Sequence, residues 1–183
     1  MRTLSLGLLA LALILVHPDR ALAQAAPPLS LENAAGEVVT LPRRHDGVDV
    51  YLFWATWCPY CKALMPHLQS IRDEYGGAVT IFALQIRDEE DPRPFFQENG
   101  FDFELIPDAD EAMGPYGMRS TPGLVLVDGN GQVRFNLYEI ALQDPPGYGA
   151  LSNRAKAARR GPAWAALLRQ EIDGLLAEVN GRD

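Results

Sequence analysis

Apolar positions along the chain form two kinds of pattern, short continuous runs and stripes at helical spacing. The runs 48–54 and 79–86 are rich in Val, Ile, Leu and aromatic residues, which is typical of strands buried on both faces. Between them, Leu64, Leu68 and Ile71 recur at spacings of four and three, as on one face of a helix. This order predicts two parallel strands joined by a helical crossover.

Turn residues divide the rest of the chain into further elements. Ala35-Gly36 interrupts the segment 31–41 and predicts an N-terminal β-hairpin, and Gly129-Asn130-Gly131 predicts a second hairpin. The other predicted elements are a helix at 91–99, a strand at 103–106, a helical turn or two at 110–116, hairpin strands at 123–128 and 132–138, and a final helix at 162–179. The alternation favours an α/β fold, with a mixed central sheet, helices on both faces and an N-terminal β-hairpin.

The N-terminus carries an export pattern. A largely apolar run at 4–16 is shorter than the ~20 residues that span a bilayer, and a small-x-small sequence ending at Ala23 follows it. We therefore expect residues 1–23 to be a signal peptide cleaved near Ala23, with Ala25 as a second choice and an uncleaved membrane anchor as the alternative. The mature chain, 24–183, is then a single periplasmic domain in an oxidising compartment.

Charge and cysteine content exclude several classes of protein. The net charge of −8 argues against nucleic acid as a partner and against anionic lipid. Two cysteines are too few for a disulfide-dense scaffold or a Cys-rich zinc module, so we expect no metal site. We also expect a monomer.

The two cysteines, Cys58 and Cys61, stand at the predicted start of a helix, directly after a buried strand. Unpaired backbone N–H groups and the helix dipole favour a thiolate on the first cysteine, and the second lies close enough to form a disulfide with it. Cys58 is therefore predicted to be exposed and to attack a substrate disulfide, with Cys61 shielded and resolving the mixed disulfide. An inert structural disulfide and a metal site are the alternatives.

The sequence around these cysteines resembles the thioredoxin superfamily, in particular its exported TlpA/ResA/DsbE-type branch. The stretch from Phe53 to Cys61 reads Phe-Trp-Ala-Thr-Trp-Cys-Pro-Tyr-Cys, which is similar to the hallmark of that branch. Tyr116 to Pro122, with the Gly123–Asp128 strand after it, resembles the family's cis-proline loop and its following hairpin. The resemblance covers roughly residues 29–140.

The resemblance implies a thioredoxin-like fold and a set of site residues. Pro122 would be the cis-proline, Thr121 would pair through its backbone with an extended substrate segment, and Trp57 would form a wall of the substrate groove. Pro59 and Tyr60 would tune the active site. The redox-active Cys58–Cys61 disulfide would serve in place of a cofactor.

The implied function is that of an exported thiol-disulfide oxidoreductase, in the first place a TlpA/DsbE-type reductase of cysteines in exported proteins, with cytochrome c maturation as one setting. A DsbD-like thiol electron donor in the membrane would be its partner. A disulfide oxidase or isomerase is one alternative, and a non-catalytic thioredoxin-like binding module or copper chaperone is another.

Two positions depart from the family pattern. Relatives place a carboxylate six residues before the first cysteine or three after the second, and here these positions are Leu52 and Leu64. Asp49 and Glu104 are the nearest acidic candidates, and neither fits the pattern. The segment 139–161 is predicted to be a surface insertion, whose basic residues are interpreted as a solvated face rather than as a wall of the substrate groove.

Overall fold

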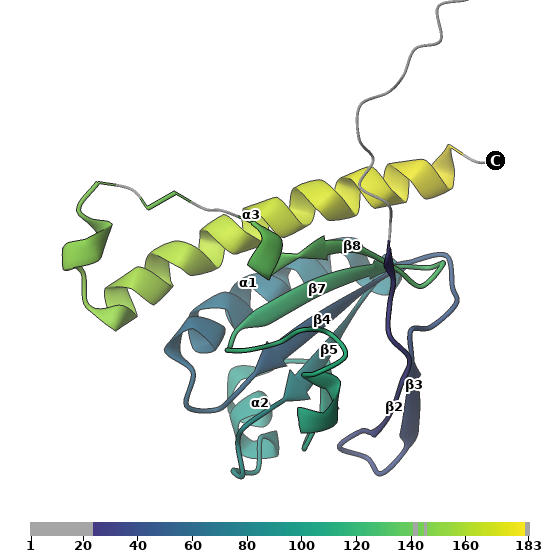
Figure 1. The fold of residues 1–183 in the computed structure, drawn as a ribbon, viewed down its shortest axis with the longest axis horizontal. Coiled ribbons are helices and arrows are strands. Elements are labelled where there is room, and N and C mark those ends of the chain that lie inside the picture. Colours follow the sequence, from purple (N-terminus) through teal and green to yellow (C-terminus); the bar gives the residue numbers. More distant parts are fainter. Residues whose placement is uncertain (1–23, 141–142, 145, 182–183) are drawn as a thin grey trace, which may run out of the picture.

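The computed structural model describes residues 24–140, 143–144 and 146–181, so the expected signal peptide at 1–23 lies outside the described residues. One six-stranded sheet and one two-stranded hairpin make up the β structure (Figure 1). The strands are β1 (Gln24–Ala25), β2 (Leu29–Glu32), β3 (Val38–Leu41), β4 (Val48–Trp54), β5 (Val79–Gln85), β6 (Glu104–Ile106), β7 (Gly123–Asp128) and β8 (Gln132–Asn136). The helices are α1 (Pro59–Tyr75), α2 (Arg93–Asn99) and α3 (Asn153–Asn180), with 3₁₀ turns at Gly76–Ala78, Asp110–Ala112, Leu137–Glu139 and Tyr148–Ala150.

The main sheet is mixed, in the order β1-β8-β7-β4-β5-β6. β4 pairs in parallel with β5 and β5 with β6, whereas β7 runs antiparallel to both β4 and β8. β4 is central and buried along its whole length, which explains its continuous apolar sequence. The predicted parallel pair with a helical crossover and the two predicted hairpins are therefore confirmed.

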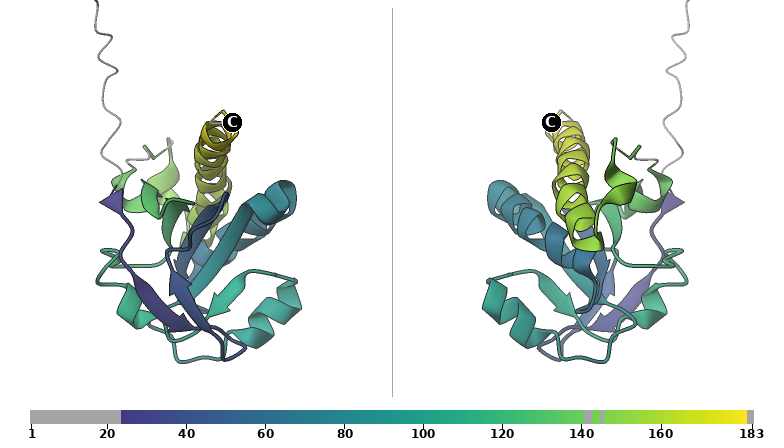
Figure 2. Two further views of the ribbon diagram at one scale, coloured as in Figure 1. Left: turned by 90° about the vertical axis from the view of Figure 1, so that its right-hand side faces the viewer. Right: turned by 90° about the vertical axis from the view of Figure 1, so that its left-hand side faces the viewer.

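The two faces of the sheet are covered differently. The helices α1, α2 and α3 enclose one apolar cluster with Val50, Leu52 and Trp54 of β4. On the other face, Tyr51 and Phe53 pack with the β2–β3 hairpin and with residues 109–118, which include the Asp110–Ala112 turn. Figure 2 shows α1 and the hairpin on opposite sides of the sheet. Helical segments thus lie on both faces, although the second face carries only a short 3₁₀ turn.

The last helix differs from its prediction. α3 begins at Asn153, where the Ser152 hydroxyl accepts a hydrogen bond from the Ala155 N–H, and not near Pro162. Pro162 lies inside the helix on an exposed side, so the carbonyl that its missing N–H leaves free can be hydrated. The last part of the expected surface insertion, residues 153–161, is therefore the beginning of this helix.

Candidate active site

Cys58 is the N-cap residue of α1 and forms a disulfide with Cys61. The Cys58 backbone is extended and closes the loop that follows β4. Pro59 comes next, at the first helical position, where a missing N–H costs no hydrogen bond. The Cys61 N–H points at the Cys58 Sγ, 3.1 Å away. A negative charge that develops on Cys58 therefore lies at a helix N-terminus with a donor already directed at the sulfur.

The expected exposure of Cys58 is wrong for this disulfide form. Cys58 is 1% exposed and Cys61 is fully buried. Both belong to the large buried cluster that also contains Trp54, Leu124 and Leu137, from β4, β7 and the turn after β8. The sulfur atoms are thus shielded by side chains from elements that are distant in sequence, a property that the local motif does not reveal.

Trp57 is the exposed side chain at the site, with 58% of its surface accessible. Its indole Nε1 donates to the Arg87 carbonyl at 3.0 Å. The Arg87 side chain in turn donates to the Arg119 carbonyl at 2.8 Å, in the segment before Pro122. These contacts connect the loops that follow β4 and β5 with the loop that precedes β7, so the orientation of Trp57 is fixed from three segments.

The peptide bond between Thr121 and Pro122 is cis, as the sequence comparison implied. Gly123, directly after it, pairs with Phe53 across the antiparallel β4–β7 ladder, which puts the loop beside the end of β4. Gly123 also has no room for a side chain, because a Cβ there would lie 2.3 Å from the Met118 sulfur. The Ser120 N–H donates to the Tyr138 hydroxyl at 3.0 Å and anchors the loop to the turn after β8.

Tyr60 connects the cysteine motif to the last helix. Its ring centroid lies 6.0 Å from that of Trp164 in α3. Burial and a hydrogen bond with Tyr148 raise the pKa of Tyr60. Tyr60, Thr121 and Pro122 line one open groove, and Trp57 is not among the residues that line it. The structure therefore brings three of the predicted site residues together in this groove and places Trp57 on a separate part of the rim.

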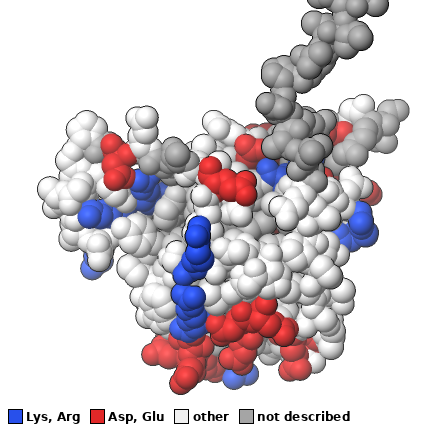
Figure 3. Space-filling model, in the orientation of Figure 1, with Lys and Arg blue, Asp and Glu red and all other residues white. Residues whose placement is uncertain are grey.

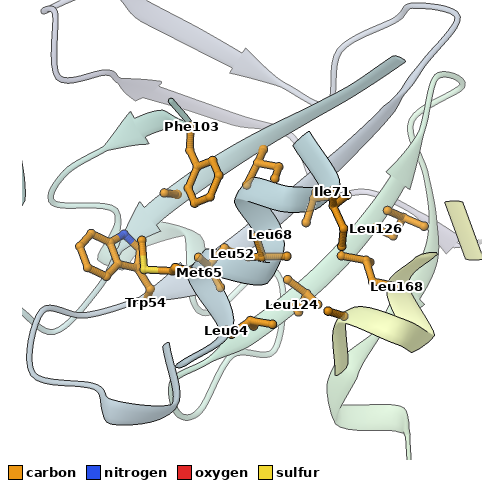
Figure 4. Close-up of a cluster of buried hydrophobic side chains, with 14 of the residues drawn as sticks. Leu52, Trp54, Leu64, Met65, Leu68, Ile71, Phe103, Leu124, Leu126 and Leu168 are labelled. Carbon is orange, nitrogen blue, oxygen red and sulfur yellow. The ribbon is translucent and has the colours of Figure 1, made fainter. Parts of the chain in front are cut away.

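The leucines at the two carboxylate positions are both fully buried in the core, as Figure 4 shows. The acidic candidates named from the sequence are engaged elsewhere. Asp49, near the start of β4, is bound by Arg43, and Glu104 accepts a hydrogen bond from Asn33. Both carboxylates are thus engaged away from the cysteines, which agrees with the expectation that neither fits the family pattern.

The structure adds two acidic residues that the sequence analysis missed. Asp88 accepts a hydrogen bond from the Thr56 N–H, and Glu90 accepts one from the Thr56 hydroxyl at 3.1 Å. Burial raises the pKa of Asp88, but the hydrogen bonds from Thr56 and neighbouring groups outweigh it, so its pKa is lowered. The signal for this pair is tertiary: β5 runs parallel to β4, so the loops after both strands meet at one edge of the sheet.

Within the part of the chain that the structure describes, no group of three or more His, Cys, Asp or Glu residues is arranged to hold a metal ion.

A mixed sheet with a helix-capping cysteine pair and an adjacent cis-proline loop defines the class of thioredoxin-like thiol-disulfide oxidoreductases. The sequence model of the AhpC/TSA family matches residues 22–136, and the chain belongs to this family. The thiol-disulfide oxidoreductase ResA of Halalkalibacterium halodurans is 33% identical over 122 residues, which are 63% of this chain and 69% of the relative. This protein is accordingly a thiol-disulfide oxidoreductase.

A second relative agrees with this assignment, and a solved structure agrees with the fold. The thiol:disulfide interchange protein DsbE homologue of Paracoccus denitrificans is 27% identical over 123 residues, 63% of this chain and 65% of the relative. A crystal structure assigned to a DsbE-type protein of Chlorobium tepidum is similar with a TM-score of 0.64 and 23% identity, over 84% of this chain and 96% of that one. This structural similarity supports the thioredoxin-like fold.

Proposed function

We propose that the protein is an exported disulfide reductase that acts on cysteines of other exported proteins, with apocytochromes c as one candidate substrate. The observation that carries the proposal is the position of Cys58 at the N-terminus of α1, beside a partner cysteine and the Thr121–Pro122 loop. The reductive direction is supported by the resemblance to the TlpA/ResA/DsbE branch.

The reaction proceeds in two exchanges. The Cys58 thiolate attacks one sulfur of a substrate disulfide, forms a mixed disulfide and displaces the first substrate thiolate. The Cys61 thiolate then attacks the Cys58 sulfur, which releases the second substrate thiolate and forms the Cys58–Cys61 disulfide. Two electrons pass to the substrate, whose two thiolates take up protons, and a thiol donor must then reduce the protein again.

Each remaining site residue has a proposed role. Trp57 contacts the substrate from the rim, the backbone of Thr121 pairs with an extended substrate segment, and Pro122 forms the platform beneath it. Pro59 and Tyr60 tune the cysteine pair. The pair itself stores the electrons, so the proposal includes no further cofactor.

Export to the periplasm is supported by the apolar run at 4–16 and the cleavage pattern ending at Ala23. A membrane-bound DsbD-like thiol donor would supply electrons there, and the protein would act as a monomer. None of the helices that the structure describes combines the length and apolar character needed to cross a bilayer. Cell fractionation followed by N-terminal sequencing tests the export step: periplasmic protein that starts at Gln24 supports it, and protein confined to the cytoplasm that starts at Met1 contradicts it.

Replacement of single cysteines tests the exchange mechanism. Cys61→Ala leaves the attacking Cys58 in place without its resolving partner, so mixed disulfides with substrates should accumulate. Non-reducing gels after acid quenching would show these adducts. Cys58→Ala is the matched control and should form several-fold fewer adducts, because Cys61 lies inside α1 and lacks the helix N-terminal position that favours a thiolate on Cys58. Equal trapping by both variants, or by neither, would contradict the proposed roles.

The absence of a carboxylate at Leu52 and Leu64 favours a second candidate, a disulfide oxidase or isomerase. Without a buried base, deprotonation of Cys61 and release of a mixed disulfide are slower. Equilibration of the protein with glutathione buffers decides between the two directions. A potential near or below about −270 mV supports the reductase, and one near about −120 mV supports the oxidase.

A further inference from the structure

An open groove of about 350 Å³ runs from the cysteine motif to the last helix, and we call it the α3 groove. Tyr60 and the Thr121–Pro122 loop line its active-site side. Ile140, after β8, and Arg160 and Trp164, from α3, line the other side. The groove is therefore continuous with the residues beside the reactive cysteines.

Arg160 and Trp164 form the α3 wall of the groove. This wall exists because α3 begins at Asn153, before these residues, and lies close to α1. A Cβ on Gly161 would lie 2.6 Å from the Ala63 carbonyl oxygen, so the two backbones are in close contact at this point. Farther along, Arg169 pairs with Glu74 at 2.7 Å, so the helices run in the same direction. The turns before Gly161 therefore extend alongside and past the start of α1, where the cysteines lie (Figure 1).

Contacts between Arg160 and the segment that precedes α3 also hold the α3 wall in place. Tyr148 is buried, and the Arg160 guanidinium lies 4.7 Å from its ring centroid. The Arg160 Nε donates to the Tyr148 hydroxyl at 3.1 Å, and the same guanidinium pairs with Asp144. Because that pairing offsets its charge, the groove presents mainly aromatic and aliphatic surface to a ligand.

Acidic side chains gather on the lower part of the face in Figure 3, where Figure 1 shows α2 and the turn before β7, and basic side chains lie near the start of α3. Asp88, Glu89 and Glu90 follow β5 on that side, near Trp57. Ile140, by contrast, is a large apolar side chain with 39% of its surface exposed in the groove. The site therefore has an acidic flank and an apolar flank.

We infer that the α3 groove binds a bulky apolar side chain, such as Leu or Phe, adjacent to the reactive cysteine of an extended polypeptide substrate. Consecutive side chains of an extended segment point to opposite sides, so a residue next to the cysteine can reach a surface that the cysteine does not face. Trp164 and Ile140 then determine specificity, and the segment 139–161 contributes to substrate selection. This inference rests on the proposed exchange reaction and narrows its substrates.

Two peptides test the inference, each containing one cysteine in a mixed disulfide with glutathione and flanked either by Phe or by Ser. Single-turnover rate constants are measured with the pre-reduced protein, so no electron donor is needed. The wild-type protein should react roughly tenfold faster with the Phe peptide. Trp164→Ala should bring the ratio of the two rate constants close to one, and Ile140→Ser, at an exposed loop position, should lower it without depending on helix packing.

Leu167→Ala is the matched control, because Leu167 is a half-buried apolar residue of the same helix that does not line the groove. It should keep both the ratio and the rate with oxidised glutathione. The inference is overturned if the wild-type protein shows no preference, or if Leu167→Ala removes the preference as Trp164→Ala does. Failure of the proposed exchange reaction would look different: the wild-type protein would then reduce neither the peptides nor oxidised glutathione.

Discussion

At the scale of single residues, the site combines a reactive motif with unusual surroundings. Leu52 and Leu64 give Cys61 an apolar environment, which disfavours a charged thiolate there. Carboxylates are present instead near Thr56, two residues before Cys58, where Asp88 and Glu90 hold the loop after β4. The negative charge at this end of the site therefore holds the backbone and hydroxyl of Thr56 rather than contacting Cys61.

The positioning role of Asp88 should appear as a pH-dependent loss of stability in the variant Asp88→Asn. The pKa of Asp88 is lowered in the folded protein, so its stabilisation is present above the ordinary carboxylate pKa and is lost as pH falls through the lowered value. The variant should lose about 1 kcal/mol of unfolding free energy at pH 7 and a smaller amount at pH 3, because protonation of Asp88 removes part of the stabilisation as the pH falls. Urea unfolding at both pH values measures this. Glu89→Gln, in the same loop and exposed, is the control; a loss that is equal at both pH values would contradict the role.

At the scale of elements, the contact between α1 and α3 determines the shape of the site. α3 has 28 residues and is therefore about 42 Å long at 1.5 Å per residue, well beyond the 17 residues of α1. The glycine at position 161 allows the close approach that places Trp164 against Tyr60. The groove next to the cysteines thus depends on one small residue in a long helix.

Gly161→Ala and Gly174→Ala form a matched pair that tests this contact. A methyl group at 161 would clash with the Ala63 carbonyl, so we expect the first variant to lose about 1–3 kcal/mol of unfolding free energy. Gly174 has no atom within 4 Å of an added Cβ, so the second variant should gain up to about 1 kcal/mol from helix propensity. Both are measured by urea unfolding, and a stabilised Gly161→Ala would show that the helices can separate at no cost.

At the scale of the whole molecule, the disulfide and the fold are thermodynamically linked. A reductant has a disulfide that is more stable in the folded protein than in the unfolded chain, and an oxidant has the reverse. Both cysteines are buried between α1, β4 and β7. Formation or reduction of their disulfide therefore changes the packing of the core directly. Stability in the two redox states therefore reports the direction of electron flow.

If the protein is a reductase, its oxidised form should have a free energy of unfolding about 2 kcal/mol higher than that of the reduced form. The oxidised form should therefore unfold at a higher urea concentration. The measurement compares urea transitions with and without dithiothreitol. A Cys58→Ser/Cys61→Ser double variant should show the same transition in both conditions. The opposite order, with the reduced form more stable, would support the oxidase instead.

Much of the fold was predictable because its signals are local. Continuous apolar runs marked β4 and β5, and turn residues marked both hairpins, because each of these signals lies in a few consecutive residues. The start of α3 was not predictable in this way. A Gly-Pro pair normally marks a helix boundary, and only packing of Gly161 on α1 and hydration of the exposed side keep the helix continuous there.

The sequence by itself determined the chemistry of this protein: the cysteine pair at a helix start, the proline loop and the order of strands and helices along the chain. Tertiary structure alone decided the surroundings of that chemistry. The burial of Cys58, the carboxylates at Thr56 and the groove between Tyr60 and Trp164 all join residues at least thirty positions apart. Such contacts depend on strand register and helix packing, which arise only when the whole core assembles.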